Sequence, residues 1–432
     1  TTGKVGVYRG SGPAYQNQRV GNIKLHNSNL GSSEFRSYLI SSLSDDILKI
    51  AYGGAQPNIS GSAIQGIKIA LPPLAEQKQI AAKLDQLLAQ VDTLKTRLDA
   101  IPAILKRFRQ SVLAAAVSGR LTEGWRAGRD FDIGNEIDRI HESRRLLHES
   151  DSLRHLERTG KKLRPYDYST LNVEPESRDI PSSWMLVKLG GLISFLTDYH
   201  ANGSYEVLKK HIELKEREDY ACMIRATNFE KNNFEDLFVY ITKDAYEFLG
   251  KSKLYGGEIL VGKIGNAGSV YFMPNLNRPM SLAMNLFSLR FDEKLVSSKY
   301  LYLFLTSTVG KANIQKYVRG VATKSIDKKS LRSVFINYPC FEEQTEIVRR
   351  VEQLFTFAEQ IEQRVKDAQS RVNRLTQSIL AKAFRGELTA EWREQNPDLI
   401  SGEHSAEALL ERIKAEKRET KPTKKSRRKV AV

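Results

Sequence analysis

A run of apolar residues at alternating steps of four and three constrains residues 74–126 more than any other feature of the chain. Residues spaced in this way lie on one side of an α-helix, so the run predicts a long helix with a single apolar face. The residues of this face that we assign to helix packing are Ile80, Leu84, Leu87, Val91, Leu94 and Leu98. Because such a face is unstable in water, the helix must pack against another element.

The same run occurs a second time from residue 341 onward, in the same register. Its packing residues are Ile347, Val351, Leu354, Ile361, Val365 and Leu375. Each copy begins with Glu-Gln, at 76–77 and 343–344, and ends in the pattern G-x-L-T-x-x-W-R, at 119–126 and 386–393. The chain is therefore predicted to be a tandem duplication whose two long helices pack on each other as a coiled coil. Pro102 should kink or split the first helix, because proline lacks a backbone N–H.

Short strand-like and helix-like runs alternate between residues 182 and 340, which predicts one compact domain of mixed α/β structure. Residues 1–73 resemble only the last part of that domain, and their runs VGVY (5–8) and IQGIKIALPP (64–73) read as strands. The first domain is thus expected to lack its amino-terminal half. The predicted order is a partial first domain (1–73), the first helix (74–118), a charged helical linker (119–181), the complete domain (182–340), the second helix (341–386) and an ending with a short helix and a disordered basic tail (387–432).

The composition favours a polyanionic partner. The formal net charge is +16, and only part of this excess lies in the basic tail at 421–430. The two cysteines form no CxxC pair and no histidines stand at metal-ligand spacing, which predicts a reducing, cytoplasmic location and no metal site. No apolar run approaches the roughly 20 residues needed to cross a membrane.

Four stretches carry a family resemblance: LPPLAEQKQIAAKLDQLLAQVD (71–92), ILKRFRQSVLAAAVSGRLTEGWR (104–126), EEQTEIVRRVEQLF (342–355) and QSILAKAFRGELTAEWR (377–393). With the tandem layout, they resemble the specificity subunits of type I restriction-modification systems, in particular the enteric K-type (type IA) family. The resemblance implies α/β target-recognition domains separated by long antiparallel coiled-coil helices. Each domain would read one half of a bipartite DNA site. The shortened amino end departs from the family pattern and leaves recognition of the first half-site open.

The resemblance also implies the partners of the chain. The helical regions would dock two methyltransferase (modification) subunits, and two restriction/translocase subunits would complete a complex that defends the host against foreign DNA. The chain would bind double-stranded DNA and would hold no cofactor itself. S-adenosylmethionine, ATP and Mg²⁺ would be used by the partner subunits, and no membrane takes part.

Polar residues at loop and strand ends of the complete domain are the candidate DNA contacts. Arg225 can fork onto a guanine edge or a phosphate, Asn228 can pair with adenine, and Lys324 suits a phosphate. The full candidate set is Arg225, Thr227, Asn228, Lys263, Asn266, Ser269, Thr323, Lys324 and Ser325. Glycines 262, 265 and 268 are expected to let the backbone approach DNA. Gln56 and Asn58 occupy the equivalent loop of the first copy.

Two other classes of function are weighed against a DNA specificity subunit. A scaffold that uses the coiled coil to dimerise would show no sequence preference on DNA. A nuclease or methyltransferase would turn over without partners, but the chain has no phosphate-binding loop and no glycine-rich cofactor loop. Asp198 with Glu213 and Lys215 imitates a nuclease D…E-x-K triplet, which a chain with 27% charged residues contains by chance. No catalytic residue is therefore assigned.

Overall fold

The computed structural model describes residues 4–8, 10, 12–17, 20–25, 27–51, 59–163, 173–174 and 180–419. Its internal contacts divide the chain into two compact units. Unit 1 comprises residues 1–102 and 362–432, and unit 2 comprises residues 103–361. Among the described residues, no helix combines the length and the apolar character that a membrane crossing requires.

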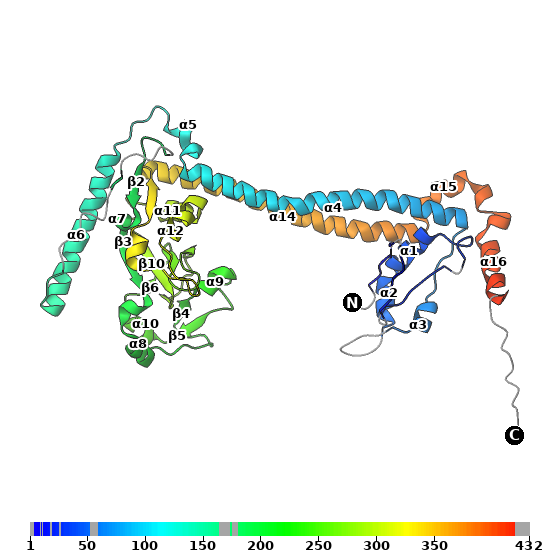
Figure 1. The fold of residues 1–432 in the computed structure, drawn as a ribbon, viewed down its shortest axis with the longest axis horizontal. Helices are drawn as coiled ribbons and strands as arrows, with labels where there is room; N and C mark the ends of the chain where they lie inside the picture. Colours follow the sequence, from blue (N-terminus) through cyan, green and yellow to red (C-terminus); the bar gives the residue numbers. More distant parts are fainter. Residues whose placement is uncertain are drawn as a thin grey trace, which may run out of the picture. The chain divides into compact units, whose positions relative to one another are not determined.

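Two helices of equal length carry the repeated apolar runs. Helix α4 is Leu74–Val117 and helix α14 is Phe341–Phe384, and each unit contains one part of both helices. In unit 1 the apolar core joins Leu84 and Val91 of α4 to Ile379 and Leu380 of α14. In unit 2, Val112 of α4 shares a core with the start of α14. The predicted packing of the two long helices on each other is therefore confirmed (Figure 1).

The twelve residues assigned to helix packing differ in burial. Six are buried, namely Ile80, Leu84, Val91, Ile347, Val351 and Val365. Leu87, Leu98, Leu354 and Ile361 are half-buried. Leu94 and Leu375, however, are 46% and 45% exposed and so lie outside the packed seam. A helix with about 3.6 residues per turn drifts away from a strict 3.5-residue repeat, so some positions of a long regular run turn towards solvent.

Pro102 does not split the first helix. Helix α4 runs through it as one element of 44 residues, and the proline side chain is exposed. The carbonyl that loses its hydrogen-bond donor at a proline can be hydrated when it faces water, and the packed apolar face holds the helix together on either side.

Strand β10 (Leu286–Phe291) organises the sheets of unit 2. It pairs antiparallel with β3 (Ile193–Asp198) on one side and with β7 (Ile259–Gly262) on the other, and β8 (Val270–Phe272) completes the order β3-β10-β7-β8. Successive residues of a strand point to opposite faces. Leu286 accordingly belongs to one apolar core, and Phe287 and Leu289 belong to another.

Unit 2 also contains two smaller sheets, several short helices and the long helix α6 (Figure 1). One sheet has the order β1-β2-β11, and the other has the order β5-β4-β9-β6 with β4 and β9 parallel. Their strands are β1 Val173–Glu174, β2 Met185–Lys188, β11 Phe335–Tyr338, β5 Val239–Ile241, β4 Ala221–Ile224, β9 Met280–Leu282 and β6 Lys253–Leu254. The helices are α5 Glu123–Arg126, α6 Ile133–Thr159, α7 Leu189–Leu192, α8 Tyr205–His211, α9 Ala226–Glu230, α10 Lys243–Phe248, α11 Ser298–Thr306, α12 Thr308–Gln315 and α13 Lys328–Arg332.

Unit 1 is helical in its described residues. Besides its parts of α4 and α14 it contains α1 Ser33–Ser42, α2 Ser44–Lys49, α3 Gly61–Gln65, α15 Ala390–Gln395 and α16 Ala406–Glu419. The runs 5–8 and 64–73, predicted as strands, form no strand here. Their counterparts in unit 2, β8 and β11, pair with β7 and β2. A strand needs such a hydrogen-bonding neighbour, and the described residues of unit 1 supply none.

A buried glutamate joins the start of α14 to the segment that follows α4. Glu343 is 1% exposed and accepts hydrogen bonds from Thr122 Oγ1 at 2.6 Å, Arg126 Nη1 at 2.5 Å and Trp184 Nε1 at 2.8 Å. Burial of a carboxylate is costly unless charged and polar partners compensate it, and here both oxygens are satisfied. This set, which we call the Glu343 lock, fixes the turn after α4 onto the first turn of α14.

Unit 1 contains an equivalent set, the Glu76 lock. Glu76, at the start of α4, is buried and accepts hydrogen bonds from Thr389 Oγ1 at 2.7 Å and from Arg393. Thr389 and Arg393 follow α14 in the same pattern in which Thr122 and Arg126 follow α4. The repeated Glu-Gln starts and G-x-L-T-x-x-W-R endings therefore meet crosswise, each start with the ending that follows the other helix.

The glutamine next to each lock anchors a further helix. Gln77 accepts a hydrogen bond from the backbone N–H of Ser32 at 3.1 Å, and Gln344 accepts one from that of Ser297 at 3.0 Å. Ser32 caps the N-terminus of α1 and Ser297 caps that of α11. Helix α1 of unit 1 is thus the structural counterpart of α11 in unit 2.

Helix α6 is fixed to the start of α14 by Glu136. Its carboxylate accepts hydrogen bonds from the Phe341 N–H at 3.0 and 3.2 Å, and its neighbours Ile133, Ile137 and Ile140 are buried in the core of unit 2. Burial, with a smaller contribution from the nearby carboxylate of Glu342, raises the pKa of Glu136 to about 7. Its ionisation therefore opposes folding at neutral pH.

We expect Glu136→Gln to change the pH dependence of stability. A carboxyl group whose pKa is raised on folding stabilises the folded state fully below its unfolded pKa, and this contribution is lost as pH rises through about 7. The amide can still accept from Phe341 but does not ionise. The variant should match the wild type at pH 4.5 and exceed its free energy of unfolding by about 1 kcal/mol at pH 8, allowing for partial solvent screening. Denaturant unfolding at the two pH values measures this difference.

Glu157→Gln is the matched control, because Glu157 lies exposed on the same helix. It should leave the pH profile unchanged. An identical gain at pH 4.5 and pH 8 for Glu136→Gln would contradict the assignment.

Candidate nucleic-acid interface

Two loops of unit 2 pack side by side and bring together most of the predicted DNA contacts. We call residues 262–269 and 319–326 the loop pair. The Gly265 N–H donates to the Lys324 carbonyl at 2.9 Å, and the Ile326 N–H donates to the Lys263 carbonyl at 3.0 Å. Isolated bridges join Ser325 to residues 264 and 319. The predicted residues that lie on the loop pair are Lys263, Asn266, Ser269, Thr323, Lys324 and Ser325.

The glycines of the first loop have structural roles within unit 2. A Cβ atom added at Gly262 would lie 2.2 Å from the carbonyl oxygen of Asn266 in the same loop. At Gly268, which has a φ of +82°, a Cβ atom would meet Ile314 of α12 at 2.7 Å. Gly262 therefore lets the loop close on itself, and Gly268 lets it pack against α12, while the expectation that they also let the backbone approach DNA stays a prediction. Gly265 alone has open space around it.

Helix α9 lies against the loop pair and carries the remaining candidates. Asn266 of the first loop donates a hydrogen bond to Glu230 at the end of α9, and the Tyr271 hydroxyl contacts the same carboxylate at 3.3 Å. Phe229 stacks on Tyr271 with ring centroids 4.8 Å apart. The structure thus joins all nine predicted residues in one continuous region of unit 2.

The candidates at α9 differ in how far their polar atoms are free to contact DNA. Asn228 is fully buried: its Oδ1 accepts from the Arg225 N–H at 2.9 Å, and its Nδ2 donates to the carbonyls of Asn233 and Leu237 at 3.2 and 3.1 Å. An amide used in this way has no edge free for adenine. Arg225 is half-buried and donates to the Leu237 carbonyl at 2.7 Å, whereas Thr227 is exposed.

The tip of the second loop is the most exposed part of the region. Thr323, Lys324 and Ser325 are exposed, and Val321 is 103% exposed. Hydroxyl and ammonium groups suit phosphates and base edges, and an aliphatic side chain suits the methyl group of thymine. Val321 was not among the predicted contacts, because exposure of an apolar side chain at a loop tip has no signature in the sequence.

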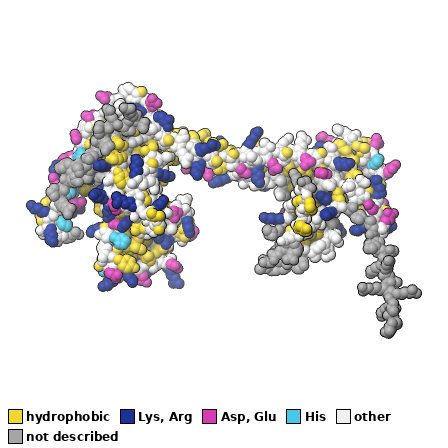
Figure 2. Space-filling view, viewed as in Figure 1, with side chains coloured by type: hydrophobic (Ala, Val, Ile, Leu, Met, Phe, Trp, Pro, Cys, Tyr) yellow, Lys and Arg dark blue, Asp and Glu magenta, His cyan; other side chains and the backbone are white. Residues whose placement is uncertain are grey.

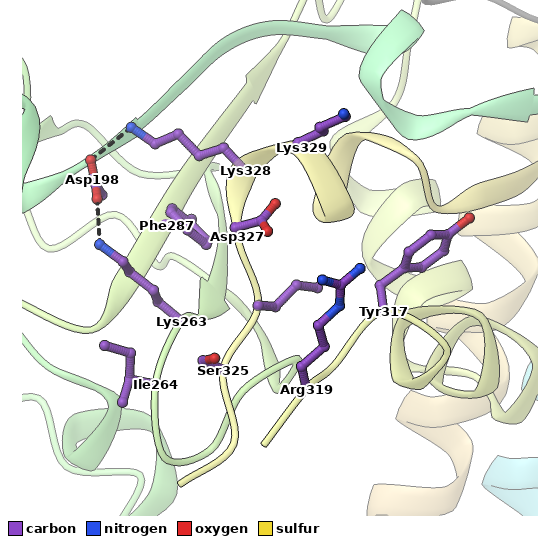
Figure 3. Close-up of a pocket in the computed structure, with 11 residues that line it drawn as sticks. Asp198, Lys263, Ile264, Phe287, Tyr317, Arg319, Ser325, Asp327, Lys328 and Lys329 are labelled. Carbon is purple, nitrogen blue, oxygen red and sulfur yellow. Dashed lines mark hydrogen bonds and ion pairs between the residues drawn. The ribbon is translucent and has the colours of Figure 1, made fainter.

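A cavity of about 600 Å³ opens beside the loop pair. Its wall holds Asp198, whose carboxylate lies between two ammonium groups, Lys263 Nζ at 2.8 Å and Lys328 Nζ at 2.7 Å (Figure 3). Burial alone would raise the pKa of Asp198, but the hydrogen bonds from the two lysines outweigh it and hold this pKa below its usual value. The carboxylate is therefore ionised at neutral pH.

Further basic residues lie around the same cavity. Arg319 and Lys329 are exposed, and neither forms an ion pair with a residue in the described part of the chain. Asp327, the second carboxylate of the lining, accepts a hydrogen bond from the Ser330 N–H at 2.7 Å and caps helix α13. The lining thus contains four cationic side chains and two carboxylates, which leaves the cavity positively charged.

The nuclease-like triplet does not assemble. Asp198 is held by two lysines, Lys215 pairs instead with Asp219 at 2.7 Å, and Glu213 is exposed. The described residues bring only Glu136, Cys340 and Glu342 close enough together to share a metal ion. There, Glu136 already accepts from a backbone N–H, and burial raises the pKa of the Cys340 thiol to about 12, which disfavours a thiolate ligand.

The loop predicted to be equivalent in the first copy, with Gln56 and Asn58, lies outside the described residues. Along the long helices, the face drawn in Figure 2 shows Lys and Arg side chains interspersed with acidic ones. Basic charge is therefore not gathered into a stripe on that face, in contrast to the lining of the cavity.

The chain matches one protein family over most of its length. The family described as "Type I restriction modification DNA specificity domain" matches residues 1–103 and 181–368, which together exceed half of the chain. The specificity subunit of the type I restriction enzyme EcoBI from Escherichia coli is 38% identical over 427 residues, covering 97% of this chain and 79% of that protein. The corresponding EcoKI subunit of Escherichia coli strain K12 is 36% identical over 392 residues, covering 89% and 71%.

A solved structure has a similar fold. A chain from a study of complex assembly and conformational transition of the type I restriction-modification system superposes with a TM-score of 0.50. It is 19% identical, and the match covers 84% of this chain and 73% of that one. This likeness concerns the fold alone.

Proposed function

Because the chain belongs to the specificity subunits of type I restriction-modification systems, we propose that the loop pair and α9 of unit 2 read the bases in one half of a bipartite DNA site. Membership of the family confirms the predicted resemblance and the prediction of a DNA specificity subunit, rather than a nuclease or methyltransferase. The single observation that carries the proposal is the loop pair itself. It brings together six predicted polar residues that are distant in sequence, and two of them, Lys263 and Ser325, line a positively charged cavity.

The proposal divides the candidate residues by availability. Thr227, Asn266, Thr323, Lys324 and Ser325 are exposed and are assigned to DNA, together with Val321. Asn228 is assigned to the support of the α9 turn, because all its polar atoms bond to the protein backbone. Arg225 keeps part of its guanidinium for DNA while it donates to the Leu237 carbonyl.

We also propose the wider assembly. The long helices would dock two methyltransferase subunits, and two restriction/translocase subunits would complete the complex in the cytoplasm. S-adenosylmethionine, ATP and Mg²⁺ would be bound by those partners. Co-expression with the methyltransferase, followed by mapping of modified adenines across a plasmid, tests the proposal. A two-part motif is expected, and a complex that co-purifies but leaves the plasmid unmodified would contradict it.

A single charge change in the loop pair tests the reading surface. Lys324→Ala should weaken binding about fivefold on target and on scrambled duplex alike, and should reduce the slope of log affinity against log salt by about 0.9, because one phosphate contact is lost. Fluorescence anisotropy at several salt concentrations measures both quantities. Lys209→Ala, an exposed lysine of α8, is the control and should change neither. An unchanged slope for Lys324→Ala would move the interface elsewhere.

A further inference from the structure

We propose that Asp198 is a positioning residue that holds the ammonium groups of Lys263 and Lys328 in place to bind one backbone phosphate of the DNA half-site. The inference rests on the proposed DNA-reading role of unit 2 and deepens it. It adds a fixed phosphate contact in the cavity to the exposed contacts of the loop pair.

The three residues come from three elements that the fold brings together. Asp198 ends strand β3, Lys263 follows strand β7, and Lys328 begins helix α13. β3 and β7 flank the central strand β10, so the first two lie on either side of it. Each carboxylate oxygen takes one lysine, with Oδ2 bonded to Lys263 and Oδ1 to Lys328. The carboxylate therefore sets the separation of the two ammonium groups.

The packing around the carboxylate fixes this arrangement. The Asp198 side chain is only 9% exposed, against 25% for Lys263 and 36% for Lys328. Both ammonium groups also lie over the ring of the buried Phe287, at 5.6 and 6.0 Å from its centroid. A lysine has three N–H donors, and the bond to Asp198 uses one. Donors thus remain for a ligand, and ordering of the long side chains is complete before the ligand arrives.

The charge and position of the cavity point to a DNA phosphate. Arg319 and Lys329 add positive charge without forming ion pairs within the described chain. Ile264 and Ser325 line the cavity and also belong to the loop pair (Figure 3). A duplex whose bases face the loop pair therefore carries its backbone past the cavity. Phosphate contacts of this kind set the register in which bases are read.

Two other roles for Asp198 can be distinguished from this one. A carboxylate can accept a hydrogen bond from the amino group of cytosine. Both oxygens of Asp198 are already occupied, however, and little of the side chain is exposed. In the second role, Asp198 would only neutralise the two lysines and would thereby weaken DNA binding. Removal of its charge would then strengthen DNA binding. The positioning role predicts the opposite change in affinity, so a binding measurement separates the two roles.

The test compares charge variants of the full-length subunit in complex with its methyltransferase. The variants are Asp198→Asn, Lys263→Ala and Lys328→Ala. Asp219→Asn is the matched control, because it removes one carboxylate from another ion pair of unit 2, with Lys215 at 2.7 Å, that does not line the cavity. Affinity is measured on the mapped target and on a scrambled duplex over a range of salt concentrations. Melting temperatures verify that each variant is folded.

The positioning role predicts a loss of affinity on removal of a negative charge. Asp198→Asn should weaken target binding roughly fivefold to tenfold, although the protein becomes more positive, while the salt slope stays the same. Each lysine variant should lower the slope by about 0.9. Tighter target binding by Asp198→Asn would overturn the proposal, as would lysine variants with an unchanged slope.

A chemical probe on the DNA keeps the test decisive if Asp198→Asn fails to fold. Methylphosphonates, which carry no charge, are placed one at a time along the half-site. One position should weaken binding by the wild type and have no effect on the Lys263→Ala/Lys328→Ala double variant. If no position behaves in this way, the cavity holds no phosphate. If Lys324→Ala also left DNA affinity and its salt slope unchanged, unit 2 would not read DNA through this surface.

Discussion

Glu343→Ala is expected to lower the free energy of unfolding of unit 2 by about 3–5 kcal/mol, because it leaves a half-buried guanidinium, a buried hydroxyl and a buried indole N–H without their acceptor. The carboxylate is 1% exposed and bonds to Thr122, Arg126 and Trp184. Hydrogen exchange of the amides at 117–126 and 341–351 should accelerate sharply, and denaturant unfolding should show the lower stability.

A surface ion pair between α14 and α11 provides the control. Glu352 bonds to Lys299 at 2.6 Å, but both side chains are more than half exposed. Glu352→Ala should therefore change stability by less than about 1 kcal/mol. Glu343→Gln should fall between the two, since the amide still accepts from Trp184 but pairs weakly with the arginine. Equal effects of the two alanine variants would show that the Glu343 lock does not stabilise the junction.

The second large effect is expected from Leu84→Asp in unit 1. Leu84 is fully buried in the core that joins α4 to Ile379 and Leu380 of α14. A carboxylate there loses the apolar contacts and is buried without a partner, which should cost about 4–5 kcal/mol and separate this part of the helix pair. Circular dichroism should report lost helix, and limited proteolysis should cleave within residues 74–102.

Leu375→Asp distinguishes burial from mere membership of the apolar run. Leu375 occupies a regular position of the second run but is 45% exposed. Its replacement should alter stability by less than about 1 kcal/mol and leave the proteolysis pattern intact. If Leu375→Asp lowered stability as much as Leu84→Asp, Leu375 would be packed in the helix pair, as the strict repeat predicts.

The helices, their pairing and the family could be predicted because their signals are local and periodic. A helix with apolar residues at steps of three and four has one face to bury, whatever surrounds it. Exposure of Leu94 and Leu375 could not be predicted, since the drift of a helix relative to its repeat depends on the packing partner. The strands expected in residues 5–8 and 64–73 were wrong for a related reason. A strand forms with a neighbour, and the run alone does not supply one.

The candidate site, too, could be predicted only in part from the sequence. The polar segments around Lys263 and Lys324 could be chosen from loop chemistry, and the fold brings them together. The use of Asn228 by the backbone could not be predicted, because its partners Asn233 and Leu237 are defined only by the closed turn. The Asp198 cluster was missed because its three residues are 65 and 130 positions apart and no motif connects them.

The crosswise locks have a consequence for the inheritance of new specificities. Glu76 bonds to the ending after α14, and Glu343 bonds to the ending after α4. Since both starts and both endings use the same residue types, each ending fits either glutamate. A genetic exchange with breakpoints inside the repeated helices would therefore preserve both junctions while replacing the domain between them. Such a chain can acquire a new reading surface in one recombination event without a compensating change in its frame.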